Sequence, residues 1–229
     1  MTAEEQKQQA GERAALLVED GMIVGLGSGT TSMAFVRALG KRISSGLRMR
    51  AVSSSVLTSR VAHAAGIELI ELESRLDLAI DGADAIELGS LRAIKGLGGA
   101  LTREKLVAVA ADQFVLVGDA GKVFSRLADS QPRVPIPVEV LPFGWQLTCS
   151  RLGLLGEPVL RMFDEKPFIT DNGNLILDLY AADYGQIPDL ANAIKEITGV
   201  IEHGLFLNMA SRAIVAGHDG VEELVVGAG

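Results

Sequence analysis

Apolar positions in the first half of the chain fall into short blocks that are separated by glycines. Within residues 3–19, Ala14, Leu17 and Val18 are spaced to share one face of a helix, and a glycine then ends it. The unbroken apolar run of residues 22–26 comes next and predicts a buried strand. The chain therefore begins with a helix and a buried strand.

The same alternation of strand and helix continues to about residue 119. Strands that alternate with helices of roughly 10 to 15 residues are typical of a parallel sheet with helices on its faces. The predicted strands are residues 48–54, 67–72, 76–80 and 113–119, and the predicted helices are residues 31–39, a segment that ends at Ala65, and residues 100–111.

The pattern changes at a proline-rich stretch, because four of the seven prolines lie within residues 132–142. Prolines at this density mark a connection between two units. Asn172–Gly173 is a strong hairpin signal, and a helix is expected where a proline and a glycine flank the apolar pattern. The predicted elements are a strand at 157–163, two strands within 166–180 joined at Asn172–Gly173, a helix at 187–199, and strands at 200–207 and 212–217.

These patterns predict an α/β fold with two domains. Residues 1–131 together with residues 207–229 are expected to form a Rossmann-like main domain around a parallel sheet, because the final segment returns to that sheet. Residues 132–206 are expected to form a smaller antiparallel α+β domain, ferredoxin-like in arrangement.

Composition and charge narrow the possible functions. A chain of 229 residues with 48% hydrophobic residues folds without a disulfide, and the single cysteine, Cys149, fits a reducing compartment. The net charge of -8 argues against a nucleic-acid partner, whose phosphates need clustered Lys and Arg. The N-terminus is polar and no stretch approaches 18 apolar residues, so we expect a cytoplasmic protein without a membrane partner.

The first cluster of glycines, Gly25, Gly27 and Gly29, lies between a predicted strand and a predicted helix. Such a turn lets the backbone approach a ligand, and the helix N-terminus offers free N–H groups to an anion. The nearby hydroxyls of Ser28, Thr30, Thr31 and Ser32 would add donors to a phosphate. The alternative is an ordinary tight turn in which Ser and Thr cap the helix.

A dinucleotide or a nucleotide triphosphate fits this turn poorly. The dinucleotide fingerprint needs glycine where Thr30 stands, and no acidic residue lies between Met33 and Ile67 to bind the ribose. The Lys-Ser/Thr pair of a P-loop is also missing at the required spacing.

A second group of candidate functional residues follows the predicted strand at 76–80. Asp81 and Asp84 come directly after it, where the carboxyl ends of parallel strands form a ligand crevice, although each could be a turn or cap residue. Lys95 precedes a second glycine-rich loop, Gly96 to Gly99, and Glu104 lies early in the next helix. Lys122 follows the next strand, and alone it would be a solvated loop lysine. The joint occurrence of these residues at one sheet edge favours a site.

In this order, the segments VGLGSGTTS, AVSSS, DGAD, IKGLGGALTREK, PVEVLP, TDNGNLILD and EHGLF resemble the type A family of ribose-5-phosphate isomerases. The resemblance implies interconversion of ribose 5-phosphate and ribulose 5-phosphate in the pentose phosphate pathway, without metal or organic cofactor, by a homodimer or a homotetramer. It departs from the family at Leu97, within the glycine run, and at Ala85, where an acidic residue is common.

The resemblance also implies roles for particular residues. Glu104 corresponds to the catalytic base, Asp81 and Asp84 to the aspartates, and Lys95 to the loop lysine. The implied contacts to phosphate and sugar are Lys7, Ser28, Gly29, Thr30, Thr31, Asp81, Gly82, Ala83, Asp84, Lys95, Gly96, Leu97, Gly98 and Lys122.

These residue types suit an aldose–ketose isomerisation, which moves a proton between C2 and C1 through an enediolate. A carboxylate whose pKa is raised by burial or by another carboxylate can take and return that proton, so Glu104 is the expected shuttle. Lys95 and the backbone of Gly96 to Gly99 would meet the developing oxyanion. Asp81 would serve ring opening or hydroxyl proton transfer, with Asp84 orienting the sugar hydroxyls. None of the three histidines is needed, and we expect them to be structural.

Two other classes of function remain open at this point. One is a related sugar-phosphate enzyme of similar architecture, such as a deaminase or a lactonase, which a substrate profile would distinguish. The other is a non-catalytic sugar-phosphate sensor, which is less favoured because the candidate carboxylates are present.

Overall fold

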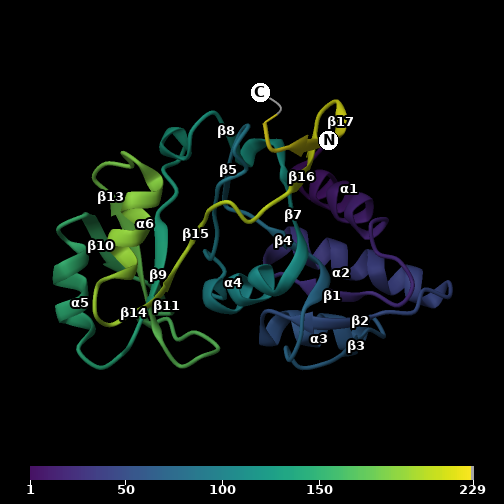
Figure 1. Ribbon diagram of the computed structural model, residues 1–229, viewed down its shortest axis with the longest axis horizontal. Helices are drawn as coiled ribbons and strands as arrows, with labels where there is room; N and C mark the ends of the chain where they lie inside the picture. The colour runs from purple at the N-terminus through teal and green to yellow at the C-terminus, as the bar shows by residue number, and fades with distance from the viewer. Residues whose placement is uncertain (228–229) are drawn as a thin grey trace.

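In the computed structural model, which describes residues 1–227, the largest sheet has seven strands in the order β17-β16-β7-β4-β1-β2-β3 (Figure 1). All neighbouring strands in it are parallel except β17, which is antiparallel to β16. The predicted parallel sheet is therefore confirmed, and β16 returns to it from the end of the chain. The strands are β1 (Ile23–Leu26), β2 (Arg50–Ser53), β3 (Glu68–Leu69), β4 (Leu76–Gly82), β7 (Ala111–Asp119), β16 (Arg212–Gly217) and β17 (Gly220–Val225).

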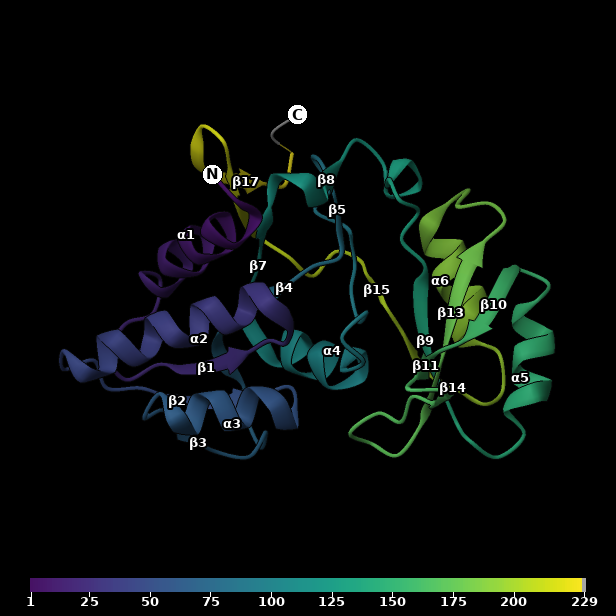
Figure 2. The ribbon, with the colours of Figure 1, turned by 180° about the vertical axis from the view of Figure 1, so that it is seen from behind.

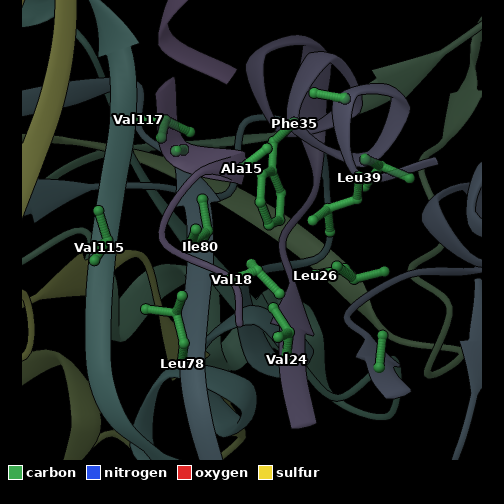
Figure 3. Packing of buried hydrophobic residues seen from close by; sticks show 14 of the residues in the cluster. Ala15, Val18, Val24, Leu26, Phe35, Leu39, Leu78, Ile80, Val115 and Val117 are labelled. Carbon is green, nitrogen blue, oxygen red and sulfur yellow. The ribbon is translucent and has the colours of Figure 1, made fainter. Parts of the chain in front are cut away.

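Helices cover both faces of this sheet. Its central strands alternate their buried side chains between the faces, since Val115 and Val117 belong to one core cluster and Phe114 and Leu116 to another. The first face packs against α1 and α2, with Phe35 fully buried at its centre (Figure 3). Full burial of such a side chain contributes about 1.5–3 kcal/mol. The helices are α1 (Ala3–Ala15), α2 (Gly29–Ser44), α3 (Val56–Ala64) and α4 (Leu101–Ala110), the last of which covers the second face.

The strand order places a switch point between β1 and β4. From β1 the chain first builds outward through β2 and β3, and it then crosses back to β4 and builds in the other direction through β7. The loops that leave the carboxyl ends of β1 and β4 therefore diverge, and ligands of open α/β sheets bind in the resulting crevice.

A second sheet has four antiparallel strands in the order β10-β13-β9-β14. With its two helices it follows the chain order β-α-β-β-α-β, so the expected ferredoxin-like arrangement is confirmed. Figures 1 and 2 show it beside the main sheet, with α5 and α6 on its far side. The elements are β9 (Ile136–Val140), α5 (Trp145–Leu152), β10 (Gly156–Leu160), β13 (Leu175–Ala181), α6 (Ile187–Lys195) and β14 (Val200–His203).

Short strands connect the two parts. A third sheet, in the order β15-β6-β5-β8, contributes buried side chains both to the core of the small sheet and to that of the main sheet. Its strands are β5 (Ala85–Glu87), β6 (Ala93–Ile94), β8 (Val123–Phe124) and β15 (Leu205–Phe206), and a separate pair consists of β11 (Met162–Phe163) and β12 (Lys166–Pro167). Two 3₁₀ turns, η1 (Ala120–Lys122) and η2 (Leu127–Asp129), flank β8.

Several predicted elements differ in the structure. The first helix ends at Ala15 rather than at residue 19, and the strand predicted at 200–207 divides into β14 and β15, which belong to different sheets. The predicted hairpin at Asn172–Gly173 is wrong, because a tight turn is present there but its flanking segments pair elsewhere. β13 pairs with β9 and β10, and β12 pairs with β11.

The proline-rich stretch contains a central strand, β9, which the sequence did not predict. Proline removes a backbone donor and is therefore unusual in the middle of a sheet. The carbonyl of Pro137 accepts a hydrogen bond from the N–H of Gly204, just past the end of β14 at His203. The nitrogen of Pro137 points to the same side, beyond the last residue of β14, so the lack of an N–H there removes no hydrogen bond between the two strands.

Within residues 1–227, none of the helices has the length and apolar character needed to cross a bilayer. Two positions of the segment 207–229 that was assigned to the main domain, residues 228 and 229, lie outside the described residues.

Candidate active site

A small cavity of about 90 Å³ lies at the switch point, at the carboxyl ends of β1 and β4. Every residue that lines it was predicted from the sequence as a site residue. They are Ser28, Gly29, Thr30, Thr31, Gly82, Ala83, Asp84, Lys95, Gly96, Gly98, Glu104 and Lys122. Three other predicted residues do not line it: Lys7 lies on α1, Asp81 lies behind the cavity, and the side chain of Leu97 is 43% exposed.

The loop after β1 presents the start of α2 to this cavity. Ser28 is the residue before the helix, and its hydroxyl bonds to that of Ser54 at 2.9 Å instead of capping α2. The first N–H groups of α2 are thus left for a ligand, and they carry the positive end of the helix dipole. Thr31 Oγ1 is buried and has no hydrogen-bond partner among residues 1–227. This loop is therefore suited to an anion such as a phosphate group.

Asp81 fixes the same loop from behind. Its Oδ1 accepts hydrogen bonds from the Ser28 N–H at 2.9 Å, the Ser32 hydroxyl at 3.0 Å and the Gly82 N–H at 2.7 Å. Gly27 makes this possible, because a Cβ there would lie 2.0 Å from Asp81 Cγ. Asp81 Oδ2 lies 2.8 Å from Lys95 Nζ. Both of its oxygens are thus engaged within the protein.

Lys95 and Glu104 form the charged centre of the site, and their side chains are only 2% and 4% exposed. Lys95 Nζ lies 3.4 Å from Glu104 Oε2 and donates a hydrogen bond to the Gly82 carbonyl. Burial alone would lower the pKa of Lys95, but the carboxylates of Asp81 and Glu104 outweigh it and raise that pKa above its ordinary value. Lys95 is therefore a permanent cation here.

Burial, together with the charge of Asp81, raises the pKa of Glu104 to about 8, although Lys95 opposes the change. Burial raises the pKa of Asp81 as well, but Lys95 and the hydrogen bonds from Ser32 and Ser28 oppose that rise. Among residues 1–227, Glu104 Oε2 accepts no hydrogen bond, and its ion pair with Lys95 is long, at 3.4 Å. A buried carboxyl group at a cavity, with its pKa raised toward neutrality, is suited to proton transfer.

Asp84, Lys122 and the second glycine-rich loop complete the cavity. Asp84 Oδ2 accepts a hydrogen bond from the Leu97 N–H at 3.0 Å, and Lys122 Nζ donates to the Ala83 carbonyl at 2.7 Å. Leu97 is not among the residues with positive φ, so the loop accommodates a side chain at this position, outside the cavity. The side chain of Leu97 therefore does not narrow the cavity.

Sequence reasoning missed the residues that hold the second loop and α4 from outside the cavity. Arg161, just after β10, donates hydrogen bonds to the carbonyls of Gly96 and Leu97, both at 2.9 Å. Phe168 packs against Gly99, where a Cβ would lie 2.4 Å from its ring. No local pattern identifies these residues, because about 65 positions separate them from the loop.

Glu139 on β9 ties α4 to the small sheet. It is completely buried and accepts hydrogen bonds from Thr102 on α4 and from the turn at residues 170–174. Arg103 also bonds to this turn, at Asn172 Oδ1 and the Asp171 carbonyl. The bonds from the turn to Glu139 come from Thr170 Oγ1 at 2.9 Å, Asn172 Nδ2 at 3.1 Å and Asn174 Nδ2 at 2.8 Å.

Other features of the described residues offer less chemistry. A larger hollow of about 540 Å³ lies between α5 and α6, but mainly apolar side chains such as Leu147 and Leu154 line it. Within residues 1–227, no group of three or more His, Cys, Asp or Glu side chains is arranged to hold a metal ion.

Comparison with known proteins identifies the relatives of this chain. The family model described as ribose 5-phosphate isomerase A (phosphoriboisomerase A) matches residues 50–220. The ribose-5-phosphate isomerase A of Gloeobacter violaceus is 48% identical over 221 residues, covering 95% of each chain. That of Thermomicrobium roseum is 49% identical over 232 residues, covering 98% of this chain and 95% of its own.

Solved structures agree with the sequence relatives. Ribose 5-phosphate isomerase A from Methanocaldococcus jannaschii superposes with a TM-score of 0.92 at 37% identity, covering 98% of this chain and all of the other. A D-ribose-5-phosphate isomerase in complex with phospho-erythronic acid superposes with a TM-score of 0.93 at 33% identity, with the same coverage. Similarity therefore extends over the cavity and over both sheets.

Proposed function

The chain belongs to the ribose-5-phosphate isomerase A family, and from this premise we propose how its cavity interconverts D-ribose 5-phosphate and D-ribulose 5-phosphate. The observation that carries the mechanism is the buried Glu104, whose pKa is raised to about 8 beside the cation of Lys95. The two ends of the substrate engage the two glycine-rich loops.

The phosphate group binds at the start of α2. The free N–H groups of this helix and the unpartnered hydroxyl of Thr31 are its donors, and the ammonium of Lys122 lines the same cavity. Binding energy from this unreactive end of the substrate holds the reacting carbons in place, so that proton transfer becomes effectively intramolecular.

Glu104 moves the proton. In its ionised form it removes the proton from C2 of the open-chain aldose, the C2–H electron pair forms a C1–C2 double bond, and the electrons of the carbonyl pass to O1. The O2 proton then transfers to O1, and Glu104 returns its proton to C1, which leaves the ketone at C2. One carboxylate thus performs both transfers, and the chemistry calls for no metal or organic cofactor.

Lys95 and the second loop stabilise the charge on the enediolate. The ammonium lies 3.4 Å from Glu104 Oε2, so it is beside the atoms at which charge develops. Asp84 lines the cavity and is the carboxylate available to the sugar hydroxyls during ring opening and the O2-to-O1 transfer. Asp81, whose oxygens are already bonded, supports the reaction indirectly as the counter-ion of Lys95 and the anchor of the first loop.

Substitution of Glu104 by Gln tests this mechanism. E104Q keeps the shape of the side chain but cannot accept the C2 proton, so kcat should fall by about 10²–10⁴-fold, as expected for loss of a general base. Binding of inorganic phosphate, measured by calorimetry, should stay within about threefold of wild type, which shows that the cavity is intact. Retention of more than about a tenth of the wild-type rate would show that Glu104 is not the base. The wild-type assay includes EDTA, and loss of activity there would contradict metal independence.

We further propose that the chain divides into a catalytic domain, residues 1–131 plus 207–229, and a small domain, residues 132–206, and that it acts as a homodimer in the cytoplasm. The division is supported by the main sheet, whose strands all come from residues 23–119 and 212–225. Light scattering of the purified protein tests the dimer, and a monomeric mass at assay concentration would refute it.

A further inference from the structure

Arg161 lies outside the cavity, yet it binds the loop that forms one of the cavity walls. Its main chain is held beside β13, where the Arg161 N–H donates to the Ile176 carbonyl at 2.9 Å. A single guanidinium nitrogen, Nη1, donates to two successive carbonyls of the loop, those of Gly96 and Leu97, both at 2.9 Å. The small sheet thus contacts the backbone of the glycine-rich loop directly.

The remaining nitrogens of this guanidinium are fixed as well. Nε donates to Asp178 Oδ2 at 2.9 Å and Nη2 to Asp178 Oδ1, so the pair is bidentate. The side chains of Arg161 and Asp178 are only 12% and 16% exposed. The guanidinium also lies over the ring of Phe168, with its Cζ at 6.0 Å from the ring centroid. A planar cation held on both edges and on one face has a single orientation.

This orientation determines where the N–H groups of the loop point. A peptide group is planar and trans, so its N–H points opposite to its C=O. In the peptide group between Gly96 and Leu97, the carbonyl accepts from Arg161 and the N–H of Leu97 donates to Asp84 at 3.0 Å. In the next peptide group, between Leu97 and Gly98, the carbonyl accepts from Arg161, so the N–H of Gly98 points away from Arg161. Gly98 itself lines the cavity.

The Gly98 N–H is therefore a donor that this loop leaves open to a ligand at the cavity. The Leu97 N–H is bonded to Asp84, and the Gly99 N–H donates to the Gly96 carbonyl at 2.9 Å, whereas within residues 1–227 the Gly98 N–H bonds to no acceptor. A cation bound to the carbonyl of the same peptide also draws electron density from its N–H, which strengthens that donor toward an oxyanion.

We propose that Arg161, fixed by Asp178 and Phe168, is a positioning residue that aims and polarises the Gly98 N–H toward the enediolate oxygens. The inference rests on the proposed function and deepens it, because it names what builds the oxyanion-binding wall of the cavity. Arg161 does not line the cavity, so it acts through the loop.

Arg161→Met tests the role of the guanidinium, and Arg42→Met is its matched control. Arg42 on α2 also uses one Nη1 to bind two main-chain carbonyls, those of Ala15 and Val18, but it does not contact the loop. For R161M, kcat should fall by about 10–100-fold while KM stays within about threefold, since the donor acts on the developing charge. R42M should keep wild-type values of both constants.

Two further measurements separate a positioning role from a general loss of structure. R161K keeps the charge and one carbonyl contact, so it should recover part of the lost kcat. Phospho-erythronic acid carries a carboxylate near the reacting end, and its affinity for R161M should fall by about tenfold, whereas the affinity for inorganic phosphate should stay within about twofold. If R161M does not fold, R161K takes its place in the same comparison against wild type.

The outcomes distinguish this inference from the proposed function. A wild-type kcat for R161M, or equal losses of affinity for phosphate and phospho-erythronic acid, would overturn the positioning role of Arg161. A wild-type protein that does not isomerise ribose 5-phosphate would instead overturn the proposed function, whatever the variants do.

Discussion

The two glycine-rich loops of the cavity are built alike but supported differently. Each leads into a helix and lies at the carboxyl edge of the main sheet, the first from Gly27 into the first turn of α2 and the second from Gly96 to Gly99 before α4. The first loop is held within that sheet, by Asp81 at the end of β4. The second is held by Arg161 and Phe168, which flank the β11–β12 pair, and the helix that follows it is held by Glu139 on the small sheet.

This difference matches the proposed roles of the two loops, which are to bind the phosphate group and to stabilise the enediolate. A phosphate group needs a fixed set of donors, and a turn buried against one carboxylate provides it. Proton transfer needs a base and oxyanion donors placed within a fraction of an ångström, so bracing from a second direction is useful. The small sheet contributes no residue to the lining of the cavity, but it thereby helps to support one of the cavity walls.

The largest expected effect comes from breaking the internal support of the first loop. In Gly27→Ala the new Cβ would lie 2.0 Å from Asp81 Cγ, within the buried carboxylate network. We expect a loss of about 3 kcal/mol or more in the free energy of unfolding, because neither the backbone nor the bonded carboxylate can move aside. Urea denaturation measures it.

Gly98→Ala in the second loop is the matched control for this prediction. A Cβ at Gly98 meets no atom within 4 Å, so stability should change by less than about 1 kcal/mol. Equal stability of G27A and wild type would show that the first loop is not held by the close approach of Asp81.

The same contrast explains what the sequence could predict. The first loop, Asp81, Asp84, Lys95 and Glu104 lie close to strand ends that apolar runs identify, so local patterns were enough to locate the candidate site. Arg161 and Glu139 could not be found, because their roles depend on where the small sheet packs. β9 was not predicted because prolines such as Pro137 are unusual within a central strand. The predicted hairpin was wrong because the turn at 170–174 bonds to Glu139 and Arg103 and does not join two paired strands.

The next prediction concerns the external support of α4. Glu139→Ala removes the acceptor of four hydrogen bonds and leaves Thr102, Thr170 and two asparagines without it in a buried site. We expect a loss of about 2–3 kcal/mol in the free energy of unfolding and a lower kcat, because unsatisfied buried donors are costly. Urea denaturation and steady-state kinetics at low temperature measure these effects.

Glu139→Gln serves as the control. Its amide oxygen can still accept from the turn and its amide nitrogen can donate to the Thr102 hydroxyl, so the loss should be below about 1 kcal/mol. If E139A and E139Q were equally stable, the account of Glu139 as the tie between α4 and the small sheet would be refuted.

The smallest predicted effect probes the first loop as a phosphate site. Thr31→Val removes the buried, unpartnered hydroxyl and keeps the shape of the side chain. The affinity for inorganic phosphate should fall by about 5–10-fold, equivalent to about 1 kcal/mol for one hydrogen bond. Thr148→Val is the control. Thr148 is similarly buried, but it lies on α5 and its hydroxyl donates to the Thr198 carbonyl. A phosphate affinity of T31V equal to that of T148V would count against the loop as the phosphate site.

If Glu104 is the base, and burial together with the charge of Asp81 raises its pKa against the effect of Lys95, the rate depends on pH in a definite direction. Only the ionised form accepts a proton, so kcat/KM should rise with pH and level off above the pKa of Glu104, which is raised to about 8. A second group on α4, Lys105, has its pKa lowered to about 8 by burial, against the opposing effect of Glu202. The variant K105M therefore shows which group causes the rise in kcat/KM, because a rise caused by Lys105 would be lost in it.

The most direct test is the profile of kcat/KM from pH 7 to pH 9 for the wild type and K105M. For a base with a pKa of about 8, the ionised fraction increases about tenfold over this range, and we predict that rise in both proteins. A profile that is flat across the range, as an ordinary exposed glutamate would give, or a rise that disappears in K105M, would contradict the account.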